Sequence, residues 1–423
     1  MAAILLKNIS VGGVRRDLLI ENGIIKRIEP EGSCSGWDLA GDLELMDCDG
    51  KVAVPGFVNM HAHAAMSLMR GVGEDKGFHD WLAHVWAIEK KLDPEFVYQG
   101  ARVACVEMIR TGTTTFNDQY WFSPQARRAA RELGIRAALG YTLLDGLDPQ
   151  KAERERALAE EDYALYKDCP LYVLSCHAVY SVSAETLVWA SDFVRKHGLR
   201  LHIHLSETRK EVEDCKEAHG GLSPVEYLDS LGVLGPEVIA AHCLWLSEHD
   251  IQLLGAAGLT CVHNINSNAK LASGYRFLYN ELRDAGVNIC LGTDGCASSN
   301  NLDMLEAMKT AALFEKAWRG NPASLPLPEL LALASENGAK ALGLNAGRIA
   351  EGALADIAIV DTDSTFFLSP APFEANFVYS AHSDCIDSLI CGGRFVMRHR
   401  EIPGEKRILE EARASLNAIF QDE

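Results

Sequence analysis

The chain has 423 residues, of which 48% are hydrophobic and 23% are charged, values typical of a globular protein that is neither disordered nor fibrous. This length exceeds what one small core can hold, so we expect a large domain and a smaller one. A formal net charge of −19 argues against nucleic acid and membrane as partners, because both require a basic surface. A small-molecule substrate and a homo-oligomer both remain open.

The sequence also indicates the compartment. The first seven residues are too short and too soon polar for a signal peptide, and no apolar run of roughly 18 residues predicts a membrane helix. The 12 cysteines occur singly, and Cys105, Cys243 and Cys290 lie within apolar runs. Because reduced, buried thiols are typical of the cytosol, we expect a cytoplasmic protein.

Residues 1–54 contain short β-like runs separated by Gly, Asn and Pro, which predict part of a small β domain. After them, strand-like runs alternate with helical patterns. Eight such runs are present, at 52–60, 113–120, 136–144, 171–179, 199–206, 238–246, 259–266 and 287–294. Helical patterns occupy 95–110, 123–133, 151–166 and 184–197. Eight alternations favour a closed (β/α)₈ TIM barrel over a doubly wound open sheet, and we assign it residues 55–346.

Beyond residue 346 the β texture returns, and the amphipathic stretch 407–419 predicts a terminal helix. The two ends of the chain therefore resemble each other and differ from the middle. We expect residues 1–54 and 347–423 to form one discontinuous β-sandwich domain beside the barrel. Asp93, Ser183 and Ser247 each precede a helical pattern, as N-cap residues do.

The polar residues gather where the predicted barrel strands end. They are His61 and His63 after the first strand, His177 in the fourth, His202, His204 and Glu207 in or after the fifth, His242 in the sixth and Asp294 at the end of the eighth. The carboxyl ends of barrel strands meet at one face, where the active site of this fold lies. Such a buried cluster is costly unless it is paired or bound to metal.

Spacing limits what can be said of individual ligands. His61 and His63 stand two residues apart, so both side chains lie on one face of a strand and can reach one ion. Imidazole is the commonest protein ligand for zinc. His202 and His204 also share a face, so periodicity does not choose between them.

Four segments make the chain recognisable. They are residues 55–63 (PGFVNMHAH), 204–207 (HLSE), 241–243 (AHC) and 292–295 (GTDG). They resemble the amidohydrolase superfamily, and within it the branch of methylthioadenosine/S-adenosylhomocysteine deaminases and triazine hydrolases. The resemblance runs through nearly the whole chain, including the split β domain.

The resemblance implies one divalent metal ion, expected to be Zn²⁺, held by His61, His63, His204 and Asp294. Members with two metals place a carboxylated lysine at the end of the fourth strand, where this chain has His177. We therefore expect a single ion.

The same resemblance implies roles for the remaining site residues. His242 would orient the attacking water and the developing oxyanion. Asp294 would accept the first proton, and Glu207 would protonate the ring nitrogen and help the amine to leave as ammonia. Metal binding would supply the nucleophile by lowering the pKa of water towards neutrality.

The implied activity is hydrolytic deamination of a 5′-modified adenosine to its hypoxanthine form. The substrate would be 5′-methylthioadenosine, S-adenosylhomocysteine, 5′-deoxyadenosine or adenosine. Residues 81–92 resemble the family segment whose glutamate binds the ribose hydroxyls, which here is Glu89, and His177 would also contact substrate. The family's arginine for the distal end of the substrate has no clean counterpart, because Arg154 and Arg156 are out of register.

Two other readings stay open. One is a deaminase or hydrolase of a free purine, pterin or triazine, since Val179 and Ile265 stand where the family usually has proline and loop geometry affects specificity. The other is a non-catalytic barrel that serves as a subunit. Retention of the four ligands together with Glu207 and His242 speaks against it.

Overall fold

A computed structural model describes residues 3–37, 43–169 and 171–419. Of the seven N-terminal residues considered above as a signal peptide, the first two lie outside the described residues. Its centre is a barrel of parallel strands, and the predicted fold class is confirmed. One sheet has the order β14-β13-β12-β11-β10-β9 and the other the order β15-β6-β7-β8. A bridge between Leu139 and Tyr172 and a bond from the Thr293 N–H to the His61 carbonyl link the two sheets.

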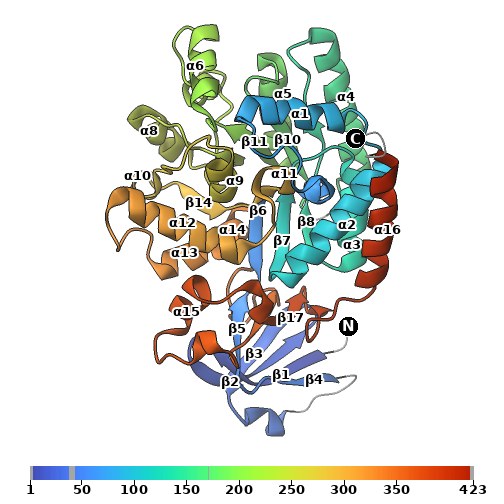
Figure 1. Ribbon diagram of the computed structural model, residues 1–423, viewed down its shortest axis with the longest axis vertical. Helices are drawn as coiled ribbons and strands as arrows, with labels where there is room; N and C mark the ends of the chain where they lie inside the picture. The colour runs from blue at the N-terminus through green and yellow to red at the C-terminus, as the bar shows by residue number, and fades with distance from the viewer. Residues whose placement is uncertain (1–2, 38–42, 170, 420–423) are drawn as a thin grey trace.

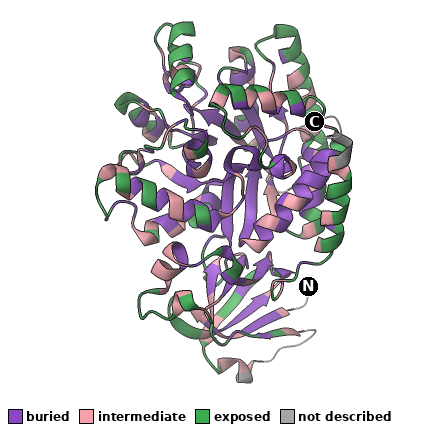
Figure 2. Cartoon of the chain, in the orientation of Figure 1, coloured by how far each residue is buried: buried purple, intermediate pink, exposed green. Residues whose placement is uncertain are grey.

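The barrel strands are β6 (Phe57–His63), β7 (Thr113–Asp118), β8 (Arg136–Ala138), β9 (Thr142–Leu143), β10 (Val173–Ala178), β11 (Arg200–Leu205), β12 (Val238–His242), β13 (Thr260–His263), β14 (Asn288–Leu291) and β15 (Asp294–Gly295). Most of their residues are buried, and Figure 2 shows the strands as a continuous buried centre.

Helices surround the strands. They are η2 (Ala64–Met69), α1 (Phe78–Glu89), α2 (Pro94–Arg110), α3 (Ser123–Leu133), α4 (Pro149–Tyr166), α5 (Ala184–His197), α6 (Arg209–Ala218), α7 (Pro224–Ser230), α8 (Glu248–Ala257), α9 (Ile265–Lys270), α10 (Tyr279–Asp284), α11 (Cys296–Ser299), α12 (Met304–Arg319), α13 (Leu327–Leu333) and α14 (Glu336–Ala341). The side chains of Asp93, Ser183 and Ser247 cap α2, α5 and α8, as the sequence predicts.

Both ends of the chain build one further sheet, with the order β18-β17-β16-β5-β1-β2-β3 and β4 beside β1. Its strands are β1 (Ala3–Val11), β2 (Val14–Glu21), β3 (Ile24–Pro30), β4 (Leu43–Asp47), β5 (Lys51–Pro55), β16 (Ile357–Asp361), β17 (Ile386–Cys391) and β18 (Arg394–Met397). The N- and C-terminal segments meet where β5 pairs with β16, with Val54 opposite Ala358. Figure 1 shows this sheet below the barrel. The boundaries at residues 54 and 346 stay predictions.

The remaining elements are η1 (Ser33–Gly36), η3 (Thr365–Phe367), α15 (Phe373–Tyr379), η4 (Ser383–Cys385) and α16 (Glu405–Ile419). The terminal helix α16 returns to the barrel and lies along α2, at the right of Figure 1. Arg102 of α2 is buried and forms ion pairs with Glu132 of α3 and with Glu411 of α16, and the second pair joins α16 to α2.

Three of the expected strands are wrong as single elements. The run 287–294 covers β14 and the first residue of β15, which lie in different sheets, and a glycine divides each of the other two. Gly56 separates β5 from β6, so the run 52–60 belongs to both sheets. A Cβ atom at position 56 would lie 2.3 Å from the Thr114 side chain, so only glycine permits this crossing. Gly140 likewise lies between β8 and β9 in the run 136–144. A Cβ there would lie 2.1 Å from the Val173 carbonyl oxygen, so this position also requires glycine.

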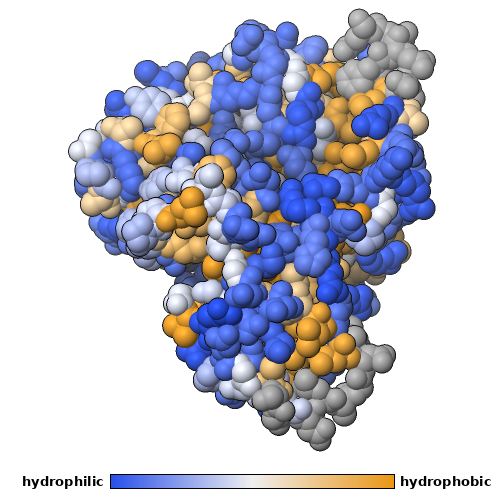
Figure 3. Space-filling view, turned by 60° about the horizontal axis from the view of Figure 1, so that its bottom comes forward, coloured by the Kyte–Doolittle hydropathy of each residue, from blue (hydrophilic) through white to orange (hydrophobic). Residues whose placement is uncertain are grey.

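Figure 3 shows one face as mainly hydrophilic, broken by small hydrophobic patches. In the described part of the chain, none of the helices combines the length and the apolar character needed to cross a membrane. Cys105, Cys243 and Cys290 are buried, as their apolar neighbours indicate.

Candidate active site

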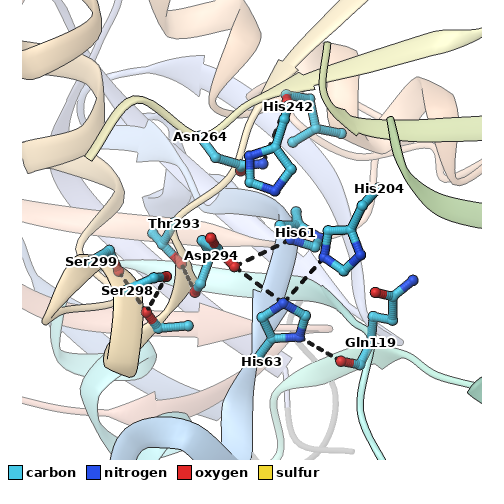
Figure 4. A network of polar contacts seen from close by, with 12 residues as sticks. His61, His63, Gln119, His204, His242, Asn264, Thr293, Asp294, Ser298 and Ser299 are labelled. Atoms are coloured by element: carbon cyan, nitrogen blue, oxygen red, sulfur yellow. Dashed lines mark hydrogen bonds and ion pairs between the residues drawn. The ribbon is translucent and has the colours of Figure 1, made fainter. Parts of the chain in front are cut away.

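A cavity opens at the carboxyl ends of the barrel strands, beneath α1. Its lining consists of His63, Met66, Phe78, Trp81, Leu82, Val85, Trp86, Glu89, Gln119, Tyr120, Trp121, Thr142, His177, Tyr180, His204, Glu207, His242 and Asp294. His61 lies directly behind this lining and is fully buried. The structure therefore brings together residues that the sequence selects from five strands. Figure 4 shows His61, His63, His204, His242 and Asp294 of this group.

At the floor of the cavity, three imidazoles surround one carboxylate. Asp294 Oδ1 lies 3.3 Å from His61 Nε2 and 3.1 Å from His63 Nε2. His204 Nε2 lies 3.4 Å from His63 Nε2, which joins the fourth candidate ligand to the group. His61, His204 and His242 also present nitrogen atoms within 4.8 Å of one another, so spacing alone does not separate His242 from the ligands.

The donor set fits a divalent cation. His61 Nε2 is buried and has no hydrogen-bond partner, although it points at the common centre. Burial acts to lower the pKa of His63, but the hydrogen bond with Asp294 raises it to about 9. The Asp294 carboxylate therefore favours a positive charge beside it. Burial acts to raise the pKa of Asp294, yet the adjacent imidazoles of His61 and His63 hold it well below its usual value. Three imidazoles and a carboxylate satisfy zinc and similar ions.

The bonds at the far side of each imidazole fix its orientation. His63 Nδ1 bonds the Gln119 carbonyl, and His204 Nδ1 lies 2.7 Å from the His177 carbonyl. Both rings therefore donate from Nδ1 and turn Nε2 towards the position of the ion.

His202 and His204, which the sequence leaves equivalent, occupy different depths. His204 lines the cavity, whereas the fully buried His202 places Nε2 2.9 Å from His61 Nδ1. Asn117 contacts the other ring nitrogen of His202 at 3.1 Å. His202 thus lies behind His61.

Glu207 and His242 face each other above the ligand cluster. Glu207 Oε1 lies 3.7 Å from His242 Nδ1, and both side chains come within 4.8 Å of Asp294. Burial raises the pKa of Glu207 well above its usual value, and the negative charges of Asp294 and Glu211 add to this effect. A raised pKa favours the protonated carboxyl group, which a general acid needs.

His242 is neutral and can donate a hydrogen bond. Burial lowers its pKa to about 3. The Asn268 amide donates to His242 Nδ1 at 3.1 Å, so the ring carries its proton on Nε2. A protonated Nε2 cannot ligate a cation but can donate to a negatively charged oxygen.

The walls of the cavity hold Glu89 and His177. Glu89, the last residue of α1, is half-buried and hydrogen-bonded to the Tyr120 hydroxyl. Burial raises its pKa, and the bond from Tyr120 acts against this. His177 Nδ1 lies 2.7 Å from the Ser181 hydroxyl, and burial lowers the pKa of His177 to about 3.

Arg154 and Arg156 do not belong to the lining of the cavity. Arg154 is exposed on α4, and Arg156 pairs with Glu185 of α5 at 2.9 Å. Neither arginine therefore stands ready to bind a substrate in this arrangement.

A model of the amidohydrolase family matches residues 52–396 of the chain. The chain belongs to the amidohydrolase family. The match includes every barrel strand and most of the C-terminal part of the outer sheet.

Curated relatives place this amidohydrolase in the branch that the sequence motifs indicate. A 5′-deoxyadenosine deaminase from Methanoregula boonei is 45% identical over 378 residues, covering 88% of this chain and 85% of the relative. A 5-methylthioadenosine/S-adenosylhomocysteine deaminase from Archaeoglobus fulgidus is 39% identical over 418 residues, covering 97% of both.

Solved structures agree with the fold. An adenosine deaminase from Xanthomonas campestris with bound zinc has a TM-score of 0.91 and 28% identity, covering 99% of this amidohydrolase and 98% of that chain. An atrazine chlorohydrolase from Arthrobacter aurescens with zinc has a TM-score of 0.89 at 22% identity, covering 98% and 100%. At that identity the second likeness concerns the fold alone.

Sequence reasoning missed several residues that shape the site of this amidohydrolase. Tyr120 bonds Glu89, Asn268 orients His242, and Glu211 bonds the backbone that carries Glu207. Only Glu211 left a signal, because Thr208-x-x-Glu211 has the form of a capping box at the start of α6.

Proposed function

We propose that this amidohydrolase is a metal-dependent hydrolytic deaminase of 5′-modified adenosines. The observation that carries the proposal is the cavity in which Glu207 faces His242 and Asp294, while Glu89 stands in the same lining. The names of the deaminase relatives support the same activity.

We assign His61, His63, His204 and Asp294 as the ligands of a single divalent ion, with zinc as the expected metal. The zinc in the Xanthomonas campestris relative supports this choice, and so does the histidine in place of lysine at the end of β10. When bound, the ion supplies Lewis-acid chemistry that makes water nucleophilic near neutral pH.

The protein's own residues move the protons. Asp294 Oδ accepts one proton from the attacking water, and Glu207 donates its proton to the ring nitrogen beside the reacting carbon. His242 Nε2–H stabilises the negative oxygen that forms on that carbon. Glu207 then takes the proton of the new hydroxyl group and passes it to the amine, which leaves as ammonia, and the proton held by Asp294 restores that of Glu207.

Glu89 is assigned to the ribose. A carboxylate accepts hydrogen bonds from two vicinal hydroxyl groups at once, and such bonds to a charged group are strong. The bond from Tyr120 already occupies part of the Glu89 carboxylate and fixes its direction.

The Glu89→Ala variant tests the ribose assignment. Each lost bond to a charged acceptor costs about 1.5–3 kcal/mol, so kcat/KM for a nucleoside should fall at least about tenfold. Slow activity on the free base should hardly change, because it lacks the hydroxyl groups. Ammonia release from the two substrates measures the effect. Asp80→Ala, an exposed carboxylate of the same helix, serves as the control. Equal losses on both substrates would mean that Glu89 supports the fold instead.

The activity itself is tested by ammonia release from six compounds. They are adenosine, 5′-methylthioadenosine, S-adenosylhomocysteine, 5′-deoxyadenosine, guanine and an aminotriazine. We expect turnover of the nucleosides and much slower turnover of the free rings. Turnover of guanine or the triazine alone would replace our proposal with the free-ring activity, and inactivity on all six would favour a non-catalytic barrel.

Among the nucleosides, S-adenosylhomocysteine, which has a charged 5′ substituent, should be the poorest substrate. Among the described residues, neither lysine nor arginine lines the cavity, whereas Phe78, Leu82, Trp86, Trp121 and Tyr180 do. A carboxylate brought beside these side chains would lose solvation without gaining a partner. We expect kcat/KM for S-adenosylhomocysteine to be at least about tenfold below that for 5′-deoxyadenosine. Equal values would contradict this prediction.

The cytoplasmic location and a homo-oligomeric state stay predictions, as does the absence of nucleic-acid and membrane partners. The charge of −19 supports that absence.

A further inference from the structure

Glu211 is a buried carboxylate that has no part in the proton transfers above. It lies in the first turn of α6, and its oxygens accept three successive backbone N–H groups. The bonds measure 2.9 Å from Ser206, 2.7 Å from Glu207 and 3.5 Å from Thr208. Burial raises the pKa of Glu211 to about 7, while the backbone donors act to lower it and favour the carboxylate.

This arrangement exceeds what a helix cap requires. In a capping box, the side chain of the third helical residue bonds only the backbone of the N-cap, which is Thr208 here. Helix α7 has the simpler form, in which Glu226 bonds the N–H of its N-cap, Ser223, at 2.7 Å. Glu211 reaches two residues further back, to the strand end that carries Glu207.

The segment that Glu211 holds is strained and is clamped from its other side. Ser206 has a φ of 51°, a left-handed conformation that costs free energy in a residue other than glycine. Its carbonyl accepts the N–H groups of Leu244 at 3.1 Å and Trp245 at 2.9 Å, in the loop that follows His242. The turn bearing Glu207 is therefore fixed between Glu211 and the loop bearing His242.

We propose that Glu211 is a positioning residue, whose carboxylate holds the Ser206–Thr208 backbone so that the Glu207 carboxyl group faces His242 and Asp294. This inference rests on the proposed function, because it assigns Glu207 as the proton carrier. Glu211 itself does not contact the substrate.

The chemistry of the acceptor makes the role specific. A carboxylate offers two oxygens with about four acceptor positions, so it can serve all three N–H groups. A glutamine keeps the shape but has one acceptor oxygen, and its NH₂ group would face a backbone N–H. The turn should then relax, and a displacement of about 1 Å at a catalytic group can cost about a hundredfold in rate.

The test compares Glu211→Gln with Glu226→Gln, which alters an ordinary capping box remote from the cavity lining. With 5′-deoxyadenosine, we expect Glu211→Gln to lower kcat about 10- to 100-fold while KM stays within about threefold. Metal content should not change, because the metal ligands are untouched. Glu226→Gln should keep kcat within about twofold.

A second substrate separates positioning from general damage. A nucleoside with chloride in place of the reacting amine needs no proton on its leaving group, so Glu211→Gln should slow it less than it slows deamination. Equal slowing of both substrates, unchanged kcat, or lost metal would overturn the proposal. If Glu211→Gln does not fold, Glu211→Asp, which keeps the charge but is one carbon shorter, should show the same pattern in weaker form.

Backbone hydrogen exchange tests Glu211 without any substrate. Exchange at the Ser206 and Glu207 N–H groups should quicken in Glu211→Gln and stay unchanged in Glu226→Gln. Unchanged exchange would overturn the role of Glu211 even if deamination is observed. Conversely, a wild-type protein inactive on every nucleoside would overturn the proposed function, whatever the exchange shows.

Discussion

The Glu207→Gln variant should turn over nucleosides about 10²–10⁴-fold more slowly than the wild type and should retain its metal. Glutamine has nearly the shape of glutamate and can still lie beside His242, but it cannot donate and recover a proton. The pKa of Glu207 is raised by burial and by the charges of Asp294 and Glu211, which favours the protonated form that the reaction uses. Steady-state ammonia release and elemental analysis measure the two quantities.

Glu213→Gln provides the matched control. Glu213 lies on α6, six residues further along the chain, but it is exposed and pairs with Arg209. Its replacement should leave kcat unchanged. If Glu207→Gln retains activity within a few fold, Glu207 is not the proton carrier. The cavity would then suit hydrolysis of a group that departs without a proton, such as a halide.

Much of the site could be predicted because, in a parallel barrel, a residue at the carboxyl end of any strand lies at the same face. The carboxyl ends of all strands lie at one face, so residues such as His61, His204 and Asp294 converge once the strands are recognised. The same logic fails within one strand. His202 and His204 point to the same side, yet they stand two residues apart along β11, about 6.6 Å. Only the assembled barrel shows that His204 reaches the cavity.

The glycine breaks and the supporting hydrogen bonds could not be predicted for a different reason. The sequence near Gly56 does not predict its contact with Thr114, because that contact forms only when β6 and β7 pair. Similarly, Asn268 and Tyr120 act through partners from other elements of the fold. Their residue types are common in loops and strands and carry no periodic signal. Such contacts depend on tertiary packing, which residue patterns do not encode locally.

Replacing both His61 and His63 with alanine should abolish metal binding and with it the deaminase activity. The wild type should contain about one transition-metal ion per chain, as three imidazoles and a carboxylate require. The double variant removes two of these donors and leaves Asp294, now without its two nearest imidazoles, buried as an uncompensated charge. Elemental analysis of protein purified with added zinc measures the metal directly, and it does not depend on knowing the substrate.

The control replaces the same number of imidazoles at the surface. His249 and His399 are exposed, and each lies near one carboxylate, so the variant with both changed to alanine should keep its metal and its activity. We expect one metal ion per chain and not two, because His177 stands where two-metal relatives carry a lysine. Two ions per wild-type chain, or undiminished metal in the His61/His63 variant, would contradict the single site.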